Sequence, residues 1–330
     1  MSLSVQLSGF ADETSQSKAA GEQFAAMAAL GLRQYTLRFI DLGSGVKNAM
    51  DLTKAELKQL VKLQAEFGLS VATLGSPIGK VKLLNVDDGT ANRYTPFKQY
   101  LKKDVAKACD LAQTLGTKLV RGFSFYHPKG EAPEAHLSQV VDQLGAIAEA
   151  CGERGLVFGL EVEANLVGQT GPLLAKIHKQ VAHPAMVLIF DAGNLLTQGY
   201  SPDETFEQYE SMKRGLGWVH IKDYRPIRTA SRGGHIDEDA LSDYQPVQTG
   251  SGVYERVLRD LAESAAPIER RLKKSGLPGV LLDLEPHVRG GGQFGGYSGP
   301  DGMGVALRGL CSMLDYLGVG YDLRGRADLT

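Results

Sequence analysis

Strand-like and helix-like segments alternate along this chain from end to end, and this alternation restricts the possible folds more than any other feature. The strand-like segments are short apolar runs bounded by turn residues, at Ser4–Gly9, Gln34–Phe39, Ser70–Gly75, Leu119–Phe125, Val157–Glu161, Val187–Asp191, Trp218–Lys222 and Val280–Glu285. Amphipathic segments with helical spacing lie between them. Four of these end just before a glycine, at Gly31, Gly68, Gly116 and Gly155, a pattern typical of a left-handed residue that terminates a helix.

Eight strands, each followed by a helix, predict a single (β/α)8 TIM barrel that occupies residues 1–330 as one domain. An open, doubly wound sheet would show the same alternation, but the number and even spacing of the units favour the barrel. The later helices are expected at Pro172–Val181, Pro202–Arg214, Gly252–Lys274 and Gly304–Leu317. Two long loops follow strands seven and eight, from Tyr224 to about Ser251 and from Arg289 to Gly304. Both loops would lie at the C-terminal face of the barrel, where active sites of this fold occur.

The composition limits the partners and the compartment. Lys and Arg total 36 against 38 Asp and Glu, and no large basic block occurs, so we expect no nucleic-acid partner. No apolar stretch approaches the roughly 20 residues of a membrane span, and the N-terminus has no signal-peptide pattern, so we expect a cytoplasmic protein that does not bind a membrane. The three cysteines, Cys109, Cys151 and Cys311, are widely spaced and odd in number, which favours reduced, buried thiols. A homo-oligomer is compatible with the sequence.

Four of the apolar runs end on a residue that can bind a divalent metal. These residues are Glu161, Asp191, His220 and Glu285, at the ends of strands five to eight. Side chains that point inward at the top of a barrel lie near its axis, so the four can share one ion. Three carboxylates and a neutral imidazole suit Mn²⁺, Mg²⁺ or Co²⁺, with Zn²⁺ as a further candidate. The sequence therefore predicts one divalent metal ion as cofactor.

Three polar neighbours of these residues are further candidates. Glu163 is the rival ligand to Glu161, because side chains alternate along a strand, but it lies beyond the strand end. Asp223 is a candidate to orient His220 or to bind substrate. Lys222 is expected to face the helices or to form a surface ion pair.

At these residues the chain resembles the xylose-isomerase-like TIM-barrel superfamily, in particular its sugar phosphate isomerase/epimerase branch. The matching segments follow the family's order: Gly159-Leu160-Glu161, Phe190-Asp191-Ala192-Gly193-Asn194, Val219-His220-Ile221-Lys222-Asp223 and Leu284-Glu285-Pro286. Two further segments, Gly9-Phe10-Ala11-Asp12-Glu13 and Ser76-Pro77-Ile78-Gly79-Lys80, resemble a subgroup of that branch. The combination is specific for the superfamily but not for the substrate, because one fold hosts many activities.

The resemblance implies that the four residues bind one divalent metal and that Glu161 and Glu285 lie on opposite faces of a bound ketose. One carboxylate would remove a proton beside a carbonyl and the other would return it, while the metal stabilises the enediolate. Simple ligation without proton transfer is the alternative for either glutamate. Many relatives have histidine at the position of Asn194, and asparagine can hydrogen-bond a sugar but cannot titrate.

Other polar residues near the strand ends are candidates for substrate contacts. His287 and Arg289 follow Glu285, and an arginine there suits phosphate or carboxylate recognition or, equally, a structural salt bridge. Lys80 is a candidate to contact an anionic or carbonyl group. Arg38 and Arg121 are candidates to line the top of the barrel, or, for Arg121, to be paired inside it.

The sequence thus favours a metal-dependent isomerase or epimerase that acts on a small carbohydrate, either a keto-sugar or a sugar phosphate. A lyase that cleaves 3-keto-glycosides by β-elimination is the alternative, because the same enediolate can expel a β-substituent. A phosphodiesterase of the AP-endonuclease type and a non-catalytic sugar-binding barrel are less favoured. The substrate, the metal identity and the oligomeric state are not specified by the residues.

Overall fold

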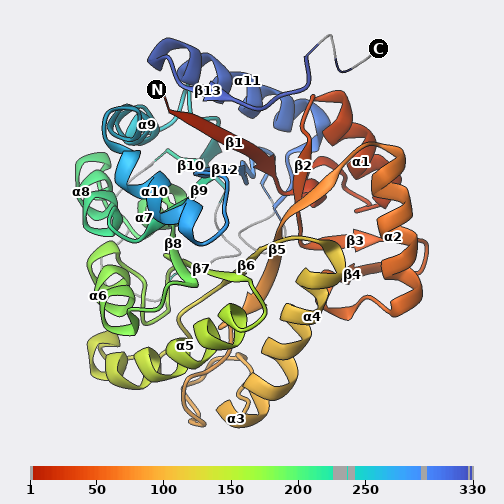
Figure 1. Cartoon of the computed structure of the whole chain (residues 1–330). Coiled ribbons are helices and arrows are strands. Elements are labelled where there is room, and N and C mark those ends of the chain that lie inside the picture. Colours follow the sequence, from red (N-terminus) through yellow and green to blue (C-terminus); the bar gives the residue numbers. More distant parts are fainter. Residues whose placement is uncertain (1–2, 226–235, 237–241, 291–295, 326–327, 329–330) are drawn as a thin grey trace.

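The chain forms a ring of parallel strands surrounded by helices, as a computed structural model shows (Figure 1). The structure describes residues 3–225, 236, 242–290, 296–325 and 328. The barrel strands are β1 (Ser4–Gly9), β2 (Gln34–Leu37), β5 (Ser70–Ile78), β6 (Leu119–Gly122), β7 (Val157–Glu161), β8 (Met186–Asp191), β9 (Leu216–Ile221) and β12 (Leu281–Leu284). They pair in the order β1-β12-β9-β8-β7-β6-β5-β2, and a parallel bridge between Phe10 and Thr36 joins the two ends of this order. The prediction of a TIM barrel is confirmed.

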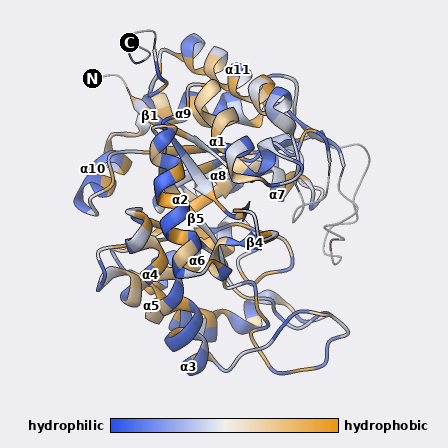
Figure 2. Ribbon diagram, turned by 90° about the vertical axis from the view of Figure 1, so that its right-hand side faces the viewer, coloured by the Kyte–Doolittle hydropathy of each residue, from blue (hydrophilic) through white to orange (hydrophobic). Residues whose placement is uncertain are grey.

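The helices cover the outside of the barrel and bury their apolar sides against the strands. They are α1 (Ala20–Ala29), α2 (Lys54–Glu66), α3 (Phe97–Tyr100), α4 (Ala106–Leu115), α5 (Leu137–Gly152), α6 (Gly171–Val181), α7 (Ala192–Leu196), α8 (Pro202–Met212), α9 (Val253–Ser264), α10 (Ala266–Lys274) and α11 (Gly299–Leu317). Figure 2 shows hydrophobic and hydrophilic residues alternating along these helices, as expected of elements with one buried face. A short π-helical segment, Leu101–Val105, joins α3 to α4. None of the helices in the described ranges has the length and hydrophobicity needed to cross a bilayer.

Short strands extend the loops at both ends of the barrel. β3 (Phe39–Asp41) pairs with β4 (Val46–Asn48), β10 (Asp223–Tyr224) pairs with β11 (Tyr244–Gln245), and β13 (Gly320–Tyr321) adds to β1. The connection from β5 to α3, residues 79–96, is a third long loop that the sequence analysis did not anticipate. Of the two long loops that it did predict, residues 226–235, 237–241 and 291–295 lie outside the described residues.

Most predicted boundaries agree with the structure, and the exceptions have local causes. Gly31, Gly68, Gly116 and Gly155 all have positive φ, which confirms their predicted role at helix ends. The helix expected over Gly252–Lys274 is two helices, because Pro267 lacks an N–H and its ring excludes the carbonyl of Glu263. The predicted strand Leu119–Phe125 ends at Gly122, and Phe125 has a φ of 67°. The last helix begins at Gly299 rather than Gly304.

A large side chain and a glycine pack together inside the barrel. Trp218 of β9 is fully buried, and its ring lies 5.4 Å from that of His220 in an edge-on arrangement. A Cβ on Gly159 of β7 would lie 2.8 Å from the indole, so only glycine leaves room for it. Trp218 therefore fills the barrel interior below His220.

The cysteines are free thiols, as predicted. Cys109 and Cys151 are buried, and Cys311 is partly buried. The sulfur atoms of Cys109 and Cys151 lie 3.7 Å apart between α4 and α5, without a disulfide bond.

Candidate active site

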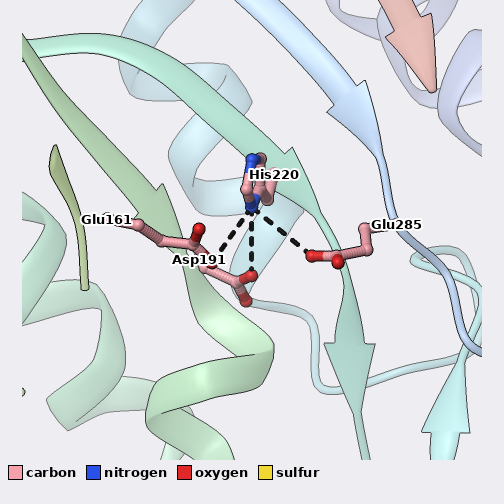
Figure 3. A group of neighbouring side chains, drawn as sticks. All are labelled: Glu161, Asp191, His220 and Glu285. Carbon is pink, nitrogen blue, oxygen red and sulfur yellow. Dashed lines mark ion pairs between the residues drawn. The ribbon is translucent and has the colours of Figure 1, made fainter. Parts of the chain in front are cut away.

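The ends of four neighbouring strands bring Glu161, Asp191, His220 and Glu285 together, and we call these residues the four-residue cluster. Each offers one ligand atom within 4.8 Å of the other three, and all four side chains are buried. In Figure 3, Glu161 and Glu285 lie on opposite sides of His220, with Asp191 between them. The register of the parallel strands explains the convergence, because β8 pairs Asp191 with His220 of β9.

The spacing of the cluster fits a shared divalent ion. Nδ1 of His220 lies 3.2 Å from Glu161 Oε1, 3.5 Å from Asp191 Oδ2 and 3.5 Å from Glu285 Oε2. Ligands at about 2.0–2.2 Å from one ion would lie roughly 3.0–3.5 Å from each other. The cluster can therefore surround one small divalent ion without a change in backbone.

Unsatisfied polar atoms in the cluster point to the same conclusion. Among the described residues, both nitrogens of His220, Glu161 Oε2 and Asp191 Oδ2 make no hydrogen bond of good geometry. Their close polar neighbours in this part of the chain are ion-pair partners, such as Lys222 at 3.0 Å from Asp191 Oδ2. Buried polar atoms without partners cost about 1–3 kcal/mol each, so native proteins rarely retain them unless something binds there. A bound cation would satisfy the carboxylate oxygens and one imidazole nitrogen.

The protonation states of the cluster reflect its mixed charges. Burial alone would lower the pKa of His220, but Glu161, Asp191 and Glu285 raise it to about 10. Burial would raise the pKa of Glu161, yet His220 and Arg121 lower it to about 2. Glu285 is also buried, but Lys222 and Arg38 hold its pKa well below the usual range. The carboxylates of Glu161 and Glu285 are therefore ionised at neutral pH.

Lys222 points into the site, so the prediction that it faces the helices or the surface is wrong. It is 1% exposed, and its Nζ lies 3.0 Å from Asp191 Oδ2 and 3.3 Å from Glu285 Oε2. Burial lowers the pKa of Lys222, but Asp191 and Glu285 raise it well above its usual value. Strand alternation contained the missed signal, because residues 218, 220 and 222 share one face.

Tyr254 of α9 was missed by sequence reasoning, and it fixes the end of β9. Its buried hydroxyl donates to the carbonyl of His220 at 2.7 Å or of Lys222 at 2.8 Å. The same oxygen accepts from the N–H of Lys222 at 3.0 Å and of Ala192 at 3.2 Å. Tyr254 therefore ties together the backbone next to His220 and Asp191. No local sequence pattern would reveal this, because the contacts span more than thirty residues.

Two arginines reach the cluster from the opposite strands. Arg38, which follows β2, donates to Glu285 Oε1 at 2.5 Å and to Asp12 Oδ2 at 3.0 Å. Arg121 of β6 lies 3.4 Å from Glu161 Oε2 and 3.8 Å from Glu285 Oε1. Both arginines were expected near the top of the barrel, and the structure places them there.

Two predicted substrate contacts line a small cleft of about 50 Å³ that opens onto the cluster. Lys80 and Glu163 face each other there, with Nζ 2.9 Å from Glu163 Oε2. Because Glu163 pairs with Lys80 in the cleft wall, the group of potential ligands includes Glu161 rather than its rival. Arg38, Arg121 and Lys222 complete the cationic part of the wall.

Two other predicted substrate contacts, Asn194 and Asp223, form hydrogen bonds within the protein. The amide nitrogen of Asn194 donates to Glu161 Oε1 and to the carbonyl of Val162, each at 3.0 Å, so it orients Glu161. Asp223 makes no hydrogen bond to the imidazole of His220 within the described residues; its oxygens accept from Ser251 and from the backbone of Tyr224. Burial raises the pKa of Asp223 to about 6.

Neither candidate that follows Glu285 lines the cleft, although His287 offers a ligand atom within 4.8 Å of those of Glu285 and Glu13. His287 is fully buried, and its Nδ1 lies 2.6 Å from Glu13 Oε1. Arg289 forms an exposed ion pair with Asp301. The salt-bridge alternative for Arg289 is the arrangement that the structure shows.

The structure is thus a TIM barrel with a buried cluster of carboxylates and an imidazole, able to hold a metal ion, at the C-terminal ends of its strands, where active sites of this fold occur. The sequence model of the xylose isomerase-like TIM barrel family matches residues 24–311. The chain belongs to this family.

Solved structures show the same fold at low sequence identity. A xylose isomerase-like TIM barrel protein from Mycobacterium smegmatis, in complex with magnesium, has a TM-score of 0.61 and 17% identity over 96% of this chain and 97% of its own. D-allulose 3-epimerase from Methylomonas sp. has a TM-score of 0.58 and 16% identity over 95% and 100%. A probable 3-DHS dehydratase from Bacillus anthracis has a TM-score of 0.60 and 12% identity over 94% and 99%. No curated protein matches the chain significantly.

Proposed function

We propose that this protein is a divalent-metal-dependent isomerase or epimerase that acts on a keto-sugar or a sugar phosphate. The observation that carries the proposal is the placement of two buried, ionised glutamates, Glu161 and Glu285, on opposite sides of one candidate metal site (Figure 3). Sugar epimerases among the structural relatives support a carbohydrate substrate. We expect one small-molecule substrate per barrel.

The four-residue cluster would hold the metal, and its donor set suits Mn²⁺, Mg²⁺ or Co²⁺, with Zn²⁺ as a further candidate. When bound, the metal supplies Lewis-acid stabilisation of negative charge on the oxygens of the substrate. Asn194 holds Glu161 through Oε1, while Arg38 holds Glu285. Both carboxylates are therefore fixed before the substrate arrives, as efficient proton transfer requires.

The proposed chemistry is a proton transfer between the substrate and these carboxylates. One glutamate removes the proton from the carbon beside the carbonyl, which forms an enediolate. The other returns a proton, to the opposite face of the same carbon in an epimerase or to the neighbouring carbon in an isomerase. Glu161 Oε2 makes no hydrogen bond among the described residues, although Arg121 lies 3.4 Å away, so we assign the proton acceptor to this oxygen.

The test is incorporation of solvent deuterium into a panel of ketoses and ketose phosphates by the Mn²⁺-loaded protein. We expect exchange at one carbon beside the carbonyl, and we expect Glu161→Gln and Glu285→Gln each to lower its rate by at least 100-fold. Glu149→Gln, on the exposed side of α5, is the matched control and should exchange normally. Absence of exchange across the panel with metal bound would contradict the proposal.

A second candidate is a lyase that removes a β-substituent from the same enediolate, for example from a 3-keto-glycoside. One structural relative is described as a probable dehydratase, which favours keeping elimination as the alternative. Release of the glycosyl group or of water from a 3-keto substrate, together with formation of an unsaturated product, would identify the lyase. Exchange without release would identify the isomerase or epimerase.

A further inference from the structure

Arg121 is a buried cation in the cleft with an unused hydrogen-bond donor. It is 7% exposed and lines the cleft beside Glu161 and Glu285. Within the described part of the chain its buried Nε has no hydrogen-bond partner. The two carboxylates lie at 3.4 Å and 3.8 Å, the range of loose ion pairs. Buried arginines normally use several of their five donors, so Arg121 is set up to bind something else.

The other cations of the cleft have close anionic partners. Arg38 is bonded to Asp12 and Glu285, and Lys80 lies 2.9 Å from Glu163. Arg121 instead contacts two aromatic rings, with its Cζ 5.0 Å from the centres of Phe10 and Phe123. These contacts restrict the guanidinium plane, which favours recognition of a flat, two-oxygen group.

The charge of the guanidinium gives the sign of the missing partner. Lys222 and Arg121 have carboxylate partners only within the four-residue cluster. Arg121 meets these carboxylates only at 3.4 Å and 3.8 Å, so a negatively charged group at hydrogen-bond distance would satisfy its donors better.

We propose that Arg121 binds an oxyanion of the substrate, so that the substrate is a carboxylated or phosphorylated keto-sugar rather than a neutral ketose. This inference rests on the proposed function, because it concerns the same cleft and the same metal. The oxyanion sits within reach of the guanidinium and beside Glu161, and it makes two parallel N–H···O bonds to Arg121. A carboxylate and a phosphate share this chemistry, and binding measurements separate them.

The experiment is calorimetric titration of the Mn²⁺-loaded protein with three six-carbon keto compounds. The probes are D-fructose, which is neutral, 5-keto-D-gluconate, which carries a carboxylate, and D-fructose 6-phosphate. We expect one of the anionic probes to bind at least tenfold more tightly than D-fructose, and the stronger of the two identifies the oxyanion. Failure of both anionic probes to bind more tightly than D-fructose would overturn the inference.

Variants of Arg121 test whether this residue causes the preference for an anionic ligand. Arg121→Met should lower the affinity for the preferred anion at least tenfold. Arg121→Lys should have a smaller effect, because lysine keeps the positive charge but cannot donate two parallel hydrogen bonds to one anion. Arg289→Met is the matched control, since this arginine forms an exposed pair with Asp301, and it should bind the anion normally. Titration with Mn²⁺ alone shows that each variant is folded and loaded.

The outcomes separate this inference from the proposed function. An anion preference that survives Arg121→Met refutes the role of Arg121. Deuterium exchange into a neutral ketose, without any anion preference, refutes the inference and leaves the isomerase or epimerase intact. Tight, Arg121-dependent anion binding without exchange or elimination refutes the proposed chemistry alone.

Discussion

Metal binding should displace a proton from His220, because the metal-free site holds this imidazole in its charged form. Burial opposes the charge, but Glu161 and its neighbouring carboxylates raise the pKa of His220 from 6.5 to about 10. A raised pKa means that the imidazolium stabilises the metal-free fold fully below pH 6.5 and that this stabilisation is lost as the pH rises through 10. A metal ligand must be the neutral imidazole, so the ion and the proton compete.

The magnitude follows from the same shift. A change in pKa from 6.5 to about 10 corresponds to about 5 kcal/mol of interaction between the imidazolium and its surroundings. At pH 7 the cost of removing this proton would weaken the apparent metal affinity by about 1,000-fold, compared with a site whose histidine is already neutral. Between pH 6.5 and 8.5 the affinity should therefore rise about tenfold per pH unit, about 100-fold in total.

Calorimetric titration of the metal-free protein with Mn²⁺ measures this coupling. Titrations at pH 6.5, 7.5 and 8.5, each in two buffers with different ionisation enthalpies, give the affinity and the number of protons released. We expect about one proton per ion at pH 7.5. His220→Gln, which offers an amide oxygen that does not titrate, should bind more weakly and release no proton.

A pH-independent affinity would refute the reasoning, as would binding without proton release. Either result would mean that His220 is neutral in the metal-free protein, despite three carboxylates within 3.5 Å. The carboxylates would then have to share a proton among themselves. Infrared spectra of the metal-free protein would show that state as a protonated carboxyl band.

Three further predictions concern residues around the cluster. Tyr254→Phe removes the hydroxyl that ties together the backbone at His220 and Asp191, and it should weaken Mn²⁺ binding by roughly tenfold with little change in the circular dichroism spectrum. Unchanged affinity would refute this positioning role. Lys222→Met removes a positive charge 3.0 Å from Asp191, so Mn²⁺ affinity should rise, by roughly tenfold, in the same titration; a fall would contradict the electrostatic argument. Gly159→Ala places a methyl group against Trp218 and should lower the free energy of unfolding by about 1–3 kcal/mol, whereas Gly145→Ala, in α5 with open space around its Cα, should stabilise the fold slightly. Chemical denaturation measures both, and equal stabilities would contradict the packing argument.

The barrel and the convergence of the four-residue cluster were accessible from the sequence because both depend on regular geometry. Parallel strands of a barrel end at a common edge, so chemical groups placed at their ends must lie close together. Glu161, Asp191 and Glu285 obey this rule, and Gly116 and Gly155 mark helix ends for an equally local reason. Their roles in metal binding and catalysis stay predictions until they are measured.

The parts that could not be predicted depend on distant contacts. Arg38 meets Glu285 across 247 positions of the chain, and Tyr254 meets the backbone of Lys222 through a hydroxyl on an outer helix. Strand alternation could have predicted the inward position of Lys222. Its charge favoured a position facing solvent instead, but buried carboxylates compensate that charge inside the barrel. The assignments of the whole chain to one domain, of a cytoplasmic location and of the absence of nucleic-acid partners also stay predictions.

In the proposed metal-dependent enzyme, the position of Lys222 would affect how the protein acquires a metal. With Lys222, Arg38, Arg121 and a protonated His220 facing its three carboxylates, the empty cluster already has its negative charge compensated. Folding then does not have to wait for an ion, in contrast to small zinc domains that are unfolded without one. Loading becomes a reversible exchange that follows the supply of ions, with the order of intrinsic affinities favouring Co²⁺ and Zn²⁺ over Mn²⁺. The ion found in purified protein will therefore report the growth medium, and activity should be compared only after the protein has been stripped and reloaded with a single metal.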